Sequence, residues 1–389
     1  MRILAMVNNF PWPGNIDGIY NLLLLRAIRE RGHEIRVLRT KPFAPPVRRH
    51  WRVHGGVPAN YTIEDIPVKT LRAILGPRSL GLGTLRFQLR NRIAQEIREF
   101  NPDVIHVHGL MPGGVMAMDA GVPYVLTAHG TETYKMPWSR KDLTALAREI
   151  VARASACAAV SDFVASHLRR LGAPDVAVVF NGADDQVFHP RDRAEARAKM
   201  ALPLEPPIVL FAGHIVRPKG IEELIAAAPS LTDLKPHFVI AGAGPMQTEL
   251  EEGLRNAGLT ATFLGFVNHE ALSQLIAASD VLTLPSHAEG LPTTLSEVMN
   301  VGRAIVATRA GGIPEIVHDG ETGFLIDVGD VPALTDRLRR VLTDAPLRER
   351  LERNALAFAR EHLTWAGNAR IYEHMYECVL KRAESAARS

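Results

Sequence analysis

The stretch that decides the fold class is residues 1–38, MRILAMVNNFPWPGNIDGIYNLLLLRAIRERGHEIRVL. Residues 3–7 form a short apolar run typical of a buried parallel strand, and a loop rich in Pro and Gly follows it. Residues 19–31 have helical spacing and end at Gly32, a residue typical of the position after a helix. Residues 33–38 form the next apolar run. A strand, a helix and a second strand in this order predict a parallel α/β sheet.

The same alternation continues along the chain with one interruption. Residues 41–85 are less regular and rich in Pro, Gly and Arg, and the polar and Pro-rich residues 183–207 suit a connection between domains. Residues 345–385 are expected to be helical throughout. Further strands are expected at residues 104–107, 124–127, 156–160, 176–179, 208–212, 238–241, 262–264, 281–284, 304–307 and 323–326.

This pattern predicts an α/β protein with two Rossmann-like, doubly wound parallel-sheet domains facing each other across a cleft. In such sheets ligands bind beyond the carboxyl ends of the strands, so we expect the active site in that cleft. The predicted parts are a first domain at residues 1–185, a linker at 186–206, a second domain at 207–362, and a helix at 363–389 that packs back on the first domain.

Composition and charge narrow the function classes. The chain has 389 residues, 47% hydrophobic and 22% charged, which suits two globular domains. The first 100 residues carry 17 Lys and Arg against seven Asp and Glu, a net charge of +10, and the remaining residues carry −7. The basic half favours an anionic lipid, a phosphate-bearing acceptor or nucleic acid, or consists of solvated helix faces. A nucleic-acid site is not expected, because aromatic residues are not interleaved with the cations.

The location is inferred from what the sequence lacks. No apolar run approaches the roughly 20 residues of a spanning helix, and the first residues enter a strand without a signal peptide. Two distant cysteines, Cys157 and Cys378, make no disulfide framework and suit a cytoplasmic, reducing compartment. Residues 67–92 mix Leu, Ile and Phe with Arg. They fit either two amphipathic helices over the sheet or a peripheral contact with the cytoplasmic face of a membrane.

The most informative motif is PSHAEGLPTTLSEVMNVG, residues 285–302, which follows a strand and opens a helix near Thr293. Pro292 suits a first helical position, and the backbone N–H groups of Gly290, Leu291, Thr293 and Thr294 suit a phosphate. Two carboxylates flank this turn, Glu289 and Glu297. They suit the hydroxyl groups of a sugar on one side of a diphosphate and of a ribose on the other. The plainer alternative is a capped helix with two surface acids.

Glu289 and Glu297 match the E-x7-E motif of the retaining glycosyltransferases of family four, and the chain resembles this family over most of its length. The resemblance implies the GT-B architecture, with an acceptor-side domain at residues 1–185 and a nucleotide-sugar donor domain at residues 207–362. The stretch RAGGIPEIVHDGETGFLID, residues 309–327, follows the family pattern too. It departs from the pattern at Ala304 and at residues 298–300. The resemblance implies that Glu289 holds hydroxyls of the donor sugar and that Glu297 binds the ribose.

A second motif, GHIVRPKG at residues 213–220, supplies two cations. Arg217 and Lys219 follow a strand, and departure of a diphosphate builds negative charge that fixed cations stabilise without a metal. The resemblance gives both residues this role; otherwise they are surface cations. We place Gly213 and Phe266 with them in the donor site.

The first domain contributes TAHGTE, residues 127–132. A lone His is more often structural, but the resemblance places His129 beside the donor sugar, where we expect it to orient the sugar. Asn181 resembles a family residue near the cleft. Gly14 and Gly18 stand where many relatives have a phosphate-binding Gly-Gly loop, and their separation departs from that pattern. The pattern of residues 11–35 resembles the subgroup that makes surface polysaccharides.

Two glycine or histidine motifs are not expected to bind a cofactor or a metal. AGAGPM, residues 241–246, lacks the third glycine of a dinucleotide fingerprint and suits close packing after a strand. HVHG, residues 106–109, has no carboxylate near it in sequence, so no metal site is expected.

The sequence thus predicts a retaining, metal-independent glycosyltransferase of the hexosyltransferase type. It needs no cofactor and uses a UDP or GDP sugar as co-substrate. The expected acceptor is a hydroxyl of a glycan, a glycolipid or a small polar molecule. The alternatives are a sugar-nucleotide epimerase or hydrolase on the same fold, and a non-catalytic nucleotide-sugar binding protein. The resemblance implies that retention comes from front-face chemistry, and no acid of the first domain is marked as the nucleophile of a double displacement.

Overall fold

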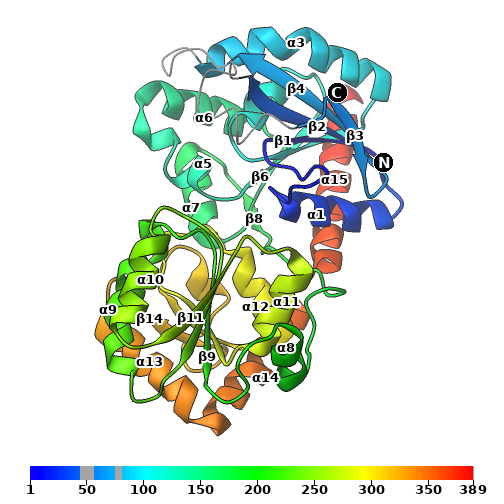
Figure 1. Ribbon diagram of the computed structural model, residues 1–389. Helices are drawn as coiled ribbons and strands as arrows, with labels where there is room; N and C mark the ends of the chain where they lie inside the picture. Colours follow the sequence, from blue (N-terminus) through cyan, green and yellow to red (C-terminus); the bar gives the residue numbers. More distant parts are fainter. Residues whose placement is uncertain (44–56, 75–80, 389) are drawn as a thin grey trace. The chain divides into compact units, whose positions relative to one another are not determined.

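The computed structural model describes residues 1–43, 57–74 and 81–388, and it divides into two compact units (Figure 1). The first unit comprises Met1–Phe180 and Trp365–Ser389, and the second comprises Asn181–Thr364. Each unit holds one sheet with helices packed on it, and all strand pairs of the two sheets are parallel except one in the first unit, which confirms the predicted pair of Rossmann-like folds.

The first sheet has the order β3-β4-β2-β1-β5-β6-β7-β8, and every neighbouring pair except β3–β4 is parallel. All strands predicted here are present, with shifted ends. Their bounds are β1 (Arg2–Val7), β2 (Glu34–Phe43), β3 (Asn60–Ile63), β4 (Ile66–Ile74), β5 (Val104–His108), β6 (Tyr124–Ala128), β7 (Ala156–Ala159) and β8 (Val176–Val178).

The hairpin β3–β4 lies in the segment that the sequence analysis left irregular. Its two turn residues, Glu64 and Asp65, have φ of 47° and 57°. Tight hairpins usually place Asn-Gly or Asp-Gly at such positions, so this pair gave no recognisable turn signal. The hairpin also corrects the alternative of two amphipathic helices at residues 67–92, since the first part of that segment is β4. Residues 44–56 and 75–80 lie outside the described residues.

The helices of the first unit cover both faces of its sheet. They are α1 (Ile19–Glu30), α3 (Gly81–Phe100), α4 (Gly113–Ala117), α5 (Thr131–Tyr134), α6 (Lys141–Arg153), α7 (Asp162–Leu171) and α15 (Trp365–Arg388), with the 3₁₀ turn η1 (Pro137–Ser139). The final helix α15 lies beside α1 (Figure 1). Its Trp365, Tyr372 and Tyr376 are buried in one core with Leu22 of α1 and Val7 of β1. The C-terminal segment therefore completes the core of the first unit.

The second sheet has the order β11-β10-β9-β12-β13-β14, and all its pairs are parallel. Every strand predicted for this region is present. The elements are β9 (Ile208–Ala212), β10 (His237–Ala241), β11 (Thr260–Gly265), β12 (Val281–Leu284), β13 (Ala304–Thr308), β14 (Phe324–Ile326), α8 (Arg193–Lys199), α9 (Ile221–Ala227), α10 (Gln247–Asn256), α11 (His269–Ala278), α12 (Thr293–Val301), α13 (Val331–Thr343) and α14 (Ala345–His362), with η2 (Arg217–Lys219), η3 (Ala228–Leu231) and η4 (Ile313–Glu315).

Residues 186–206, expected to be a linker, belong instead to the second unit. They include α8, whose Arg197 is only 6% exposed and donates to Asp280 Oδ2 at 2.6 Å. A buried ion pair of this kind ties the segment to the end of α11. The sequence signalled Pro-rich connections here but gave no sign of this long-range pair. The expected helix at residues 345–385 is likewise two helices, α14 and α15, which belong to different units.

No helix among the described residues offers a stretch that is both long and apolar enough to cross a bilayer.

Candidate active site

The second sheet reverses its strand order between β9 and β12, which lie side by side. The chain leaves β9 toward β10 on one side and leaves β12 toward β13 on the other. Ligands of doubly wound sheets bind at such a switch point, beyond the carboxyl ends of the strands. The loops after β9 and β12 carry most of the residues predicted for the donor site.

Lys219 and Glu289 meet at this switch point. Lys219 Nζ donates to Glu289 Oε1 at 2.5 Å, and the two side chains are 25% and 11% exposed. Lys219 ends the turn η2, and Glu289 lies in the loop before α12. The structure therefore joins two predicted residues that are 70 positions apart in sequence.

The loops that carry this pair touch through a glycine. Gly220 has φ of 74°, and a Cβ on it would lie 2.0 Å from the carbonyl oxygen of Pro285. The His287 N–H donates to the Pro218 carbonyl at 2.8 Å, which fastens the same two loops. Only glycine allows this approach, so the position of Lys219 depends on Gly220.

A third loop, which follows β13, packs against the backbone of Glu289 and Gly290. The Gly312 N–H donates to the Gly290 carbonyl at 3.0 Å. Gly311 has φ of 56°, and a Cβ on it would lie 1.8 Å from the Glu289 carbonyl oxygen. Gly311 and Gly312 were not predicted as site residues. The signal was present in RAGGIPE at residues 309–315, which carries two adjacent glycines directly after a strand.

The start of α12 closes the site on the next side. Pro292 precedes the helix, and no side chain caps its first turn among the described residues. Thr293 and Thr294 are half-buried. Asn181 is held against this turn: its Nδ2 lies 3.4 Å from the Leu291 carbonyl, and its own carbonyl accepts from Ser296 Oγ at 2.8 Å. Asn181 thus lies beside Leu291 and belongs to the second unit.

Glu297, one turn into α12, is enclosed by protein. It is 5% exposed, and burial raises its pKa from 4.5 to about 8. Its nearest ionisable partner is His269, whose Nε2 lies 3.9 Å from Oε1. Burial also lowers the pKa of His269, so this ring does not supply a compensating charge at neutral pH. A buried carboxyl that lacks a charged partner is suited to hydroxyl groups of a ligand.

Arg217 does not join Lys219 and Glu289. Its side chain is 72% exposed and pairs with Glu222, with Nε donating to Oε2 at 3.0 Å. Hydrogen bonding to Glu222 raises its pKa. The expectation that both cations reach the site is met here by Lys219 alone, because Arg217 faces the first turn of α9.

Gly213 and Phe266 follow β9 and β11 at the same edge of the sheet. Gly213 packs against the next loop, since a Cβ on Gly242 would lie 1.9 Å from its carbonyl oxygen. This close approach explains AGAGPM as packing between loops. Phe266 is 74% exposed, and its ring centroid lies 5.8 Å from that of His214, which is also exposed.

His129 lies at the corresponding edge of the first sheet, directly after β6. Its N–H and that of Gly130 donate to Glu132 Oε1 at 2.6 and 3.0 Å. The ring nitrogen Nε2 of His129 lies 3.2 Å from Nδ1 of His108, at the end of β5. Burial lowers the pKa of His129 to about 4 and that of His108 well below its usual value, so both rings are neutral at pH 7.

A ring contact and two hydrogen bonds connect this histidine pair with the last helix. The rings of His106 and His108 have centroids 4.0 Å apart. His106 Nε2 lies 2.8 Å from Thr127 Oγ1, and Tyr376 Oη lies 2.7 Å from His106 Nδ1. Burial lowers the pKa of His106 to about 3. The HVHG motif therefore serves as a neutral support behind His129, a role that sequence reasoning did not find.

The N-terminal loop holds the remaining predicted residues, Gly14 and Gly18, in the first unit. Both have positive φ, 86° and 73°. A Cβ on Gly18 would lie 2.3 Å from the Asn9 carbonyl oxygen, whereas Gly14 has open space around it. The glycine at position 18 is therefore required by packing at the start of α1. Across the described residues, no group of three or more His, Cys, Asp or Glu is arranged to hold a metal ion.

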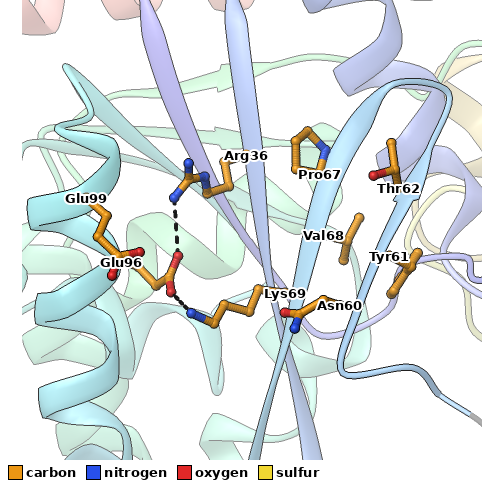
Figure 2. Close-up of a pocket in the computed structure, with 9 residues that line it drawn as sticks. All are labelled: Arg36, Asn60, Tyr61, Thr62, Pro67, Val68, Lys69, Glu96 and Glu99. Atoms are coloured by element: carbon orange, nitrogen blue, oxygen red, sulfur yellow. Dashed lines mark hydrogen bonds and ion pairs between the residues drawn. The ribbon is translucent and has the colours of Figure 1, made fainter.

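The first unit also contains a cavity of about 410 Å³ that includes none of the predicted site residues (Figure 2). Glu96 of α3 points into it and binds both Arg36 of β2 and Lys69 of β4. These cations lie in the first halves of their strands, away from the carboxyl edge. The cavity is lined by Arg36, Asn60, Tyr61, Thr62, Pro67, Val68, Lys69, Glu96 and Glu99.

Comparison with known proteins decides the family. Residues 18–187 match the family described as Glycosyltransferase Family 4, and residues 192–358 match the family described as Glycosyl transferases group 1. The chain is 32% identical to the alpha-D-kanosaminyltransferase of Streptomyces kanamyceticus, over 74% of this chain and 80% of that protein. The chain belongs to glycosyltransferase family 4.

Two further likenesses extend over nearly the whole chain of this family 4 glycosyltransferase. The putative teichuronic acid biosynthesis glycosyltransferase TuaC of Bacillus subtilis is 28% identical over 98% of this chain and 99% of its own. The crystal structure of HepE from Anabaena in complex with UDP superposes with a TM-score of 0.77 at 22% identity, covering 97% of this chain and 100% of that one. This likeness shows that the fold is GT-B, as predicted.

Proposed function

We propose that this glycosyltransferase moves a hexose from a nucleoside-diphosphate sugar to a hydroxyl group of a glycan, a lipid-linked glycan or a small polar acceptor. The anomeric configuration is retained, and no metal ion takes part. The observation that carries the proposal is the bond between Lys219 Nζ and Glu289 Oε1 at the switch point of the second sheet. It places a cation for a diphosphate beside a carboxylate for sugar hydroxyls.

Each residue of the donor site binds a different part of the nucleotide sugar. Glu289 accepts hydrogen bonds from hydroxyls of the sugar, and Glu297 accepts them from the ribose. Between them the N–H groups at the start of α12 and Lys219 bind the diphosphate, because a helix N-terminus and a cation both favour negative charge. Phe266 offers an exposed ring at the same edge. Arg217 joins the diphosphate once it leaves Glu222.

The reaction is a front-face displacement, in which the acceptor attacks on the side from which the leaving group departs. The acceptor oxygen bonds to the anomeric carbon while the bond from that carbon to the diphosphate oxygen breaks, and the leaving diphosphate takes the acceptor's proton. Lys219 stabilises the charge that grows on the leaving group. His129 is neutral at pH 7, and its buried Nδ1 makes no hydrogen bond to the described residues, so this nitrogen is free to orient the sugar.

Glu132 is the acid that a double displacement would use, since it lies beside His129. Its Oε1 already accepts two backbone N–H groups, which favours a structural role. Replacement by Gln keeps the shape of the side chain, and we expect turnover to fall by less than about tenfold. Loss of turnover in the variant, together with a covalent glycosyl-enzyme that forms in the wild type and not in the variant, would establish the nucleophilic route.

The first experiment is a thermal-shift screen of nucleotide sugars on the full chain, followed by acceptor profiling with the best donor. HepE has also been solved with UDP-glucose, so UDP-glucose is the first donor to test and GDP-mannose the second. Nuclear magnetic resonance of the product identifies its anomeric configuration. An inverted product, or loss of activity in EDTA, would overturn the corresponding part of the proposal. Nucleotide release without an acceptor would indicate the hydrolase alternative.

Variants of the second unit test the assigned roles. Lys219→Met removes the cation that stabilises the leaving group, so we expect turnover to fall roughly 10²- to 10³-fold. Arg217→Ala is expected to act in the same direction. Lys199→Met, which changes an exposed lysine of α8, serves as the matched control and should leave turnover unchanged. Near-normal turnover in Lys219→Met would sink the proposed role.

We further propose that the enzyme works in the cytoplasm, where its two free cysteines, Cys157 and Cys378, stay reduced. A peripheral contact between the basic first 100 residues and an anionic membrane is proposed as a means of reaching lipid-linked acceptors. Flotation with liposomes that contain phosphatidylglycerol tests it, and protein that stays with the unbound fraction would discard the contact.

A further inference from the structure

Arg39 is a buried cation that the chemistry above does not use. It lies in β2 at the carboxyl edge of the first sheet, in register with Val7, the last residue of β1. Its side chain is 0% exposed. None of its three guanidinium nitrogens makes a hydrogen bond to the described residues. Buried polar groups are almost always hydrogen-bonded, and a buried charge without hydrogen bonds is especially costly, so this arrangement calls for a further partner.

The groups around Arg39 leave a net positive charge. Its Cζ lies 4.3 Å from the centre of the Trp12 ring, and Lys41 Nζ lies 5.3 Å from the same ring. The carboxylate that faces it is Asp17, whose Oδ2 is 3.9 Å from Arg39 Nη2. The Tyr61 hydroxyl also faces Arg39, and this hydroxyl donates to the Pro11 carbonyl at 2.8 Å. Two cations thus face one acid.

Lys41 is a second cation whose charged form is disfavoured by its surroundings. It is 8% exposed and lies on the same face of β2 as Arg39, two residues along the strand. Burial lowers its pKa first, and repulsion from Arg39 lowers it further. Burial likewise lowers the pKa of Arg39. A bound anion would relieve both effects, because it favours the charged form of each side chain.

The opposite face of the same strand shows how this unit pairs a cation that has only a structural role. Arg36 Nη1 donates to Glu96 Oε2 at 3.4 Å, and Lys69 binds the other oxygen of the same carboxylate (Figure 2). Glu96 is 2% exposed and balances this pair of cations from α3. Arg39 and Lys41 have no comparable buried acid among the described residues.

We propose that Arg39 and Lys41 form an anion subsite that binds a phosphate group of the acceptor. The planar fork of an arginine matches two oxygens of a phosphate, and a lysine adds a second point of charge. The subsite lies at the carboxyl edge of the first sheet, the edge that also carries His129. Only the assignment of the phosphate to the acceptor rests on the proposed function; anion binding stands on the geometry alone.

Access to the subsite passes the N-terminal loop. Trp12 covers Arg39, and Asp17, with 42% of its side chain exposed, occupies the outer side. A phosphate therefore reaches the guanidinium by displacing Asp17, and it changes the surroundings of the Trp12 ring as it does so. This makes tryptophan emission a direct signal of occupancy, independent of sugar transfer.

The test is a titration of the full chain with inorganic phosphate at constant ionic strength, followed by tryptophan emission. We expect a saturable change that is absent in Trp12→Phe. Arg39→Met should weaken phosphate binding at least tenfold, and Asp17→Asn should strengthen it because it removes the competing carboxylate. Arg148→Met, which changes an exposed arginine of α6, is the matched control and should leave the affinity unchanged.

A second measurement separates an anion subsite from a structural role of Arg39. Because Arg39 makes no hydrogen bond to the described residues and its nearest carboxylate, Asp17, is 3.9 Å away, Arg39→Met should leave the melting temperature equal or higher. The proposal is overturned if the wild type gives no emission change, if Arg39→Met binds phosphate as tightly as the wild type, or if Arg39→Met melts at least 5 °C lower while Asp17→Asn binds no more tightly. Phosphate bound at the donor site would respond to Lys219→Met and not to Arg39→Met, so failure there is distinguishable.

Two arms identify the source of the phosphate. Glucose 6-phosphate represents a soluble phosphorylated acceptor, and vesicles of phosphatidylcholine with phosphatidylglycerol represent a lipid headgroup. A response to either that depends on Arg39 supports the subsite and names its source. A response to both that persists in Arg39→Met overturns it.

Discussion

Replacing Glu297 by Gln should make the protein more stable at neutral pH while weakening donor binding. Burial raises the pKa of Glu297 from 4.5 to about 8. A group whose folded pKa is raised contributes stability that is complete below pH 4.5 and is lost as pH rises toward 8. Between pH 4.5 and 7 the unfolded chain has released this proton while the folded chain retains most of it.

The size of the effect follows from that interval. About 2.5 pH units at roughly 1.4 kcal/mol each amount to about 3 kcal/mol of lost stability at pH 7. Gln has the same shape and no charge, so Glu297→Gln should recover this amount. For a unit of this size that corresponds to a rise of about 6 to 12 °C in its melting temperature. The difference should vanish below pH 4.5 and be largest above pH 8.

The assay is thermal unfolding of both proteins from pH 4 to 9, with and without UDP. Glu251→Gln, which changes an exposed carboxylate of α10, is the matched control and should show no pH-dependent difference. UDP should stabilise the wild type increasingly as pH rises from 6 to 8, since ribose hydroxyls favour the ionised carboxylate. A variant less stable than the wild type at pH 8, or a difference that does not change with pH, would refute the reasoning.

Two further predictions concern the loops around the donor site. Gly311→Ala should weaken UDP binding at least tenfold by isothermal titration, because its Cβ would displace the Glu289 carbonyl. Gly320 also has a positive φ but has open space around it, so Gly320→Ala is the control and should bind UDP normally. Equal UDP affinities of the two variants would contradict the role of Gly311 in positioning Glu289. Glu222→Gln releases Arg217 from its ion pair, so we expect UDP to bind roughly two- to fivefold more tightly at low salt. This gain in affinity should disappear when Arg217→Ala is added. Weaker UDP binding in Glu222→Gln would show that the ion pair itself is needed.

The sequence predicted the architecture well because parallel strands and helices leave local periodic patterns. Every strand expected from an apolar run is present in the structure. The hairpin β3–β4 escaped because its turn uses Glu64 and Asp65 at positive φ, where glycine or asparagine would have given a signal. The place of residues 186–206 in the second unit was not predicted for another reason. The ion pair between Arg197 and Asp280 joins residues 83 positions apart, and local composition does not indicate such a pair.

In the candidate site, too, some features could be predicted from the sequence and others depend on the folded chain. Glu289 and Glu297 are recognisable because they lie in one short motif, whereas the bond from Lys219 to Glu289 depends on β9 lying next to β12. Sequence spacing also could not show that Arg217 faces Glu222, since a loop side chain chooses among partners that only the folded chain brings near. Arg39 appeared in the sequence as one basic residue among many, and its burial alone distinguishes it.

The last helix has a consequence for the order in which the chain is made. The second unit is one continuous segment, Asn181–Thr364, so all of it is synthesised before residues 365–389. The first unit, although synthesised first, waits for Trp365, Tyr372 and Tyr376 to fill its core. The core around the N-terminal sheet is therefore completed only after the second unit has been synthesised. A nonsense codon after Thr364 should leave a foldable C-terminal unit attached to an N-terminal unit with an open core.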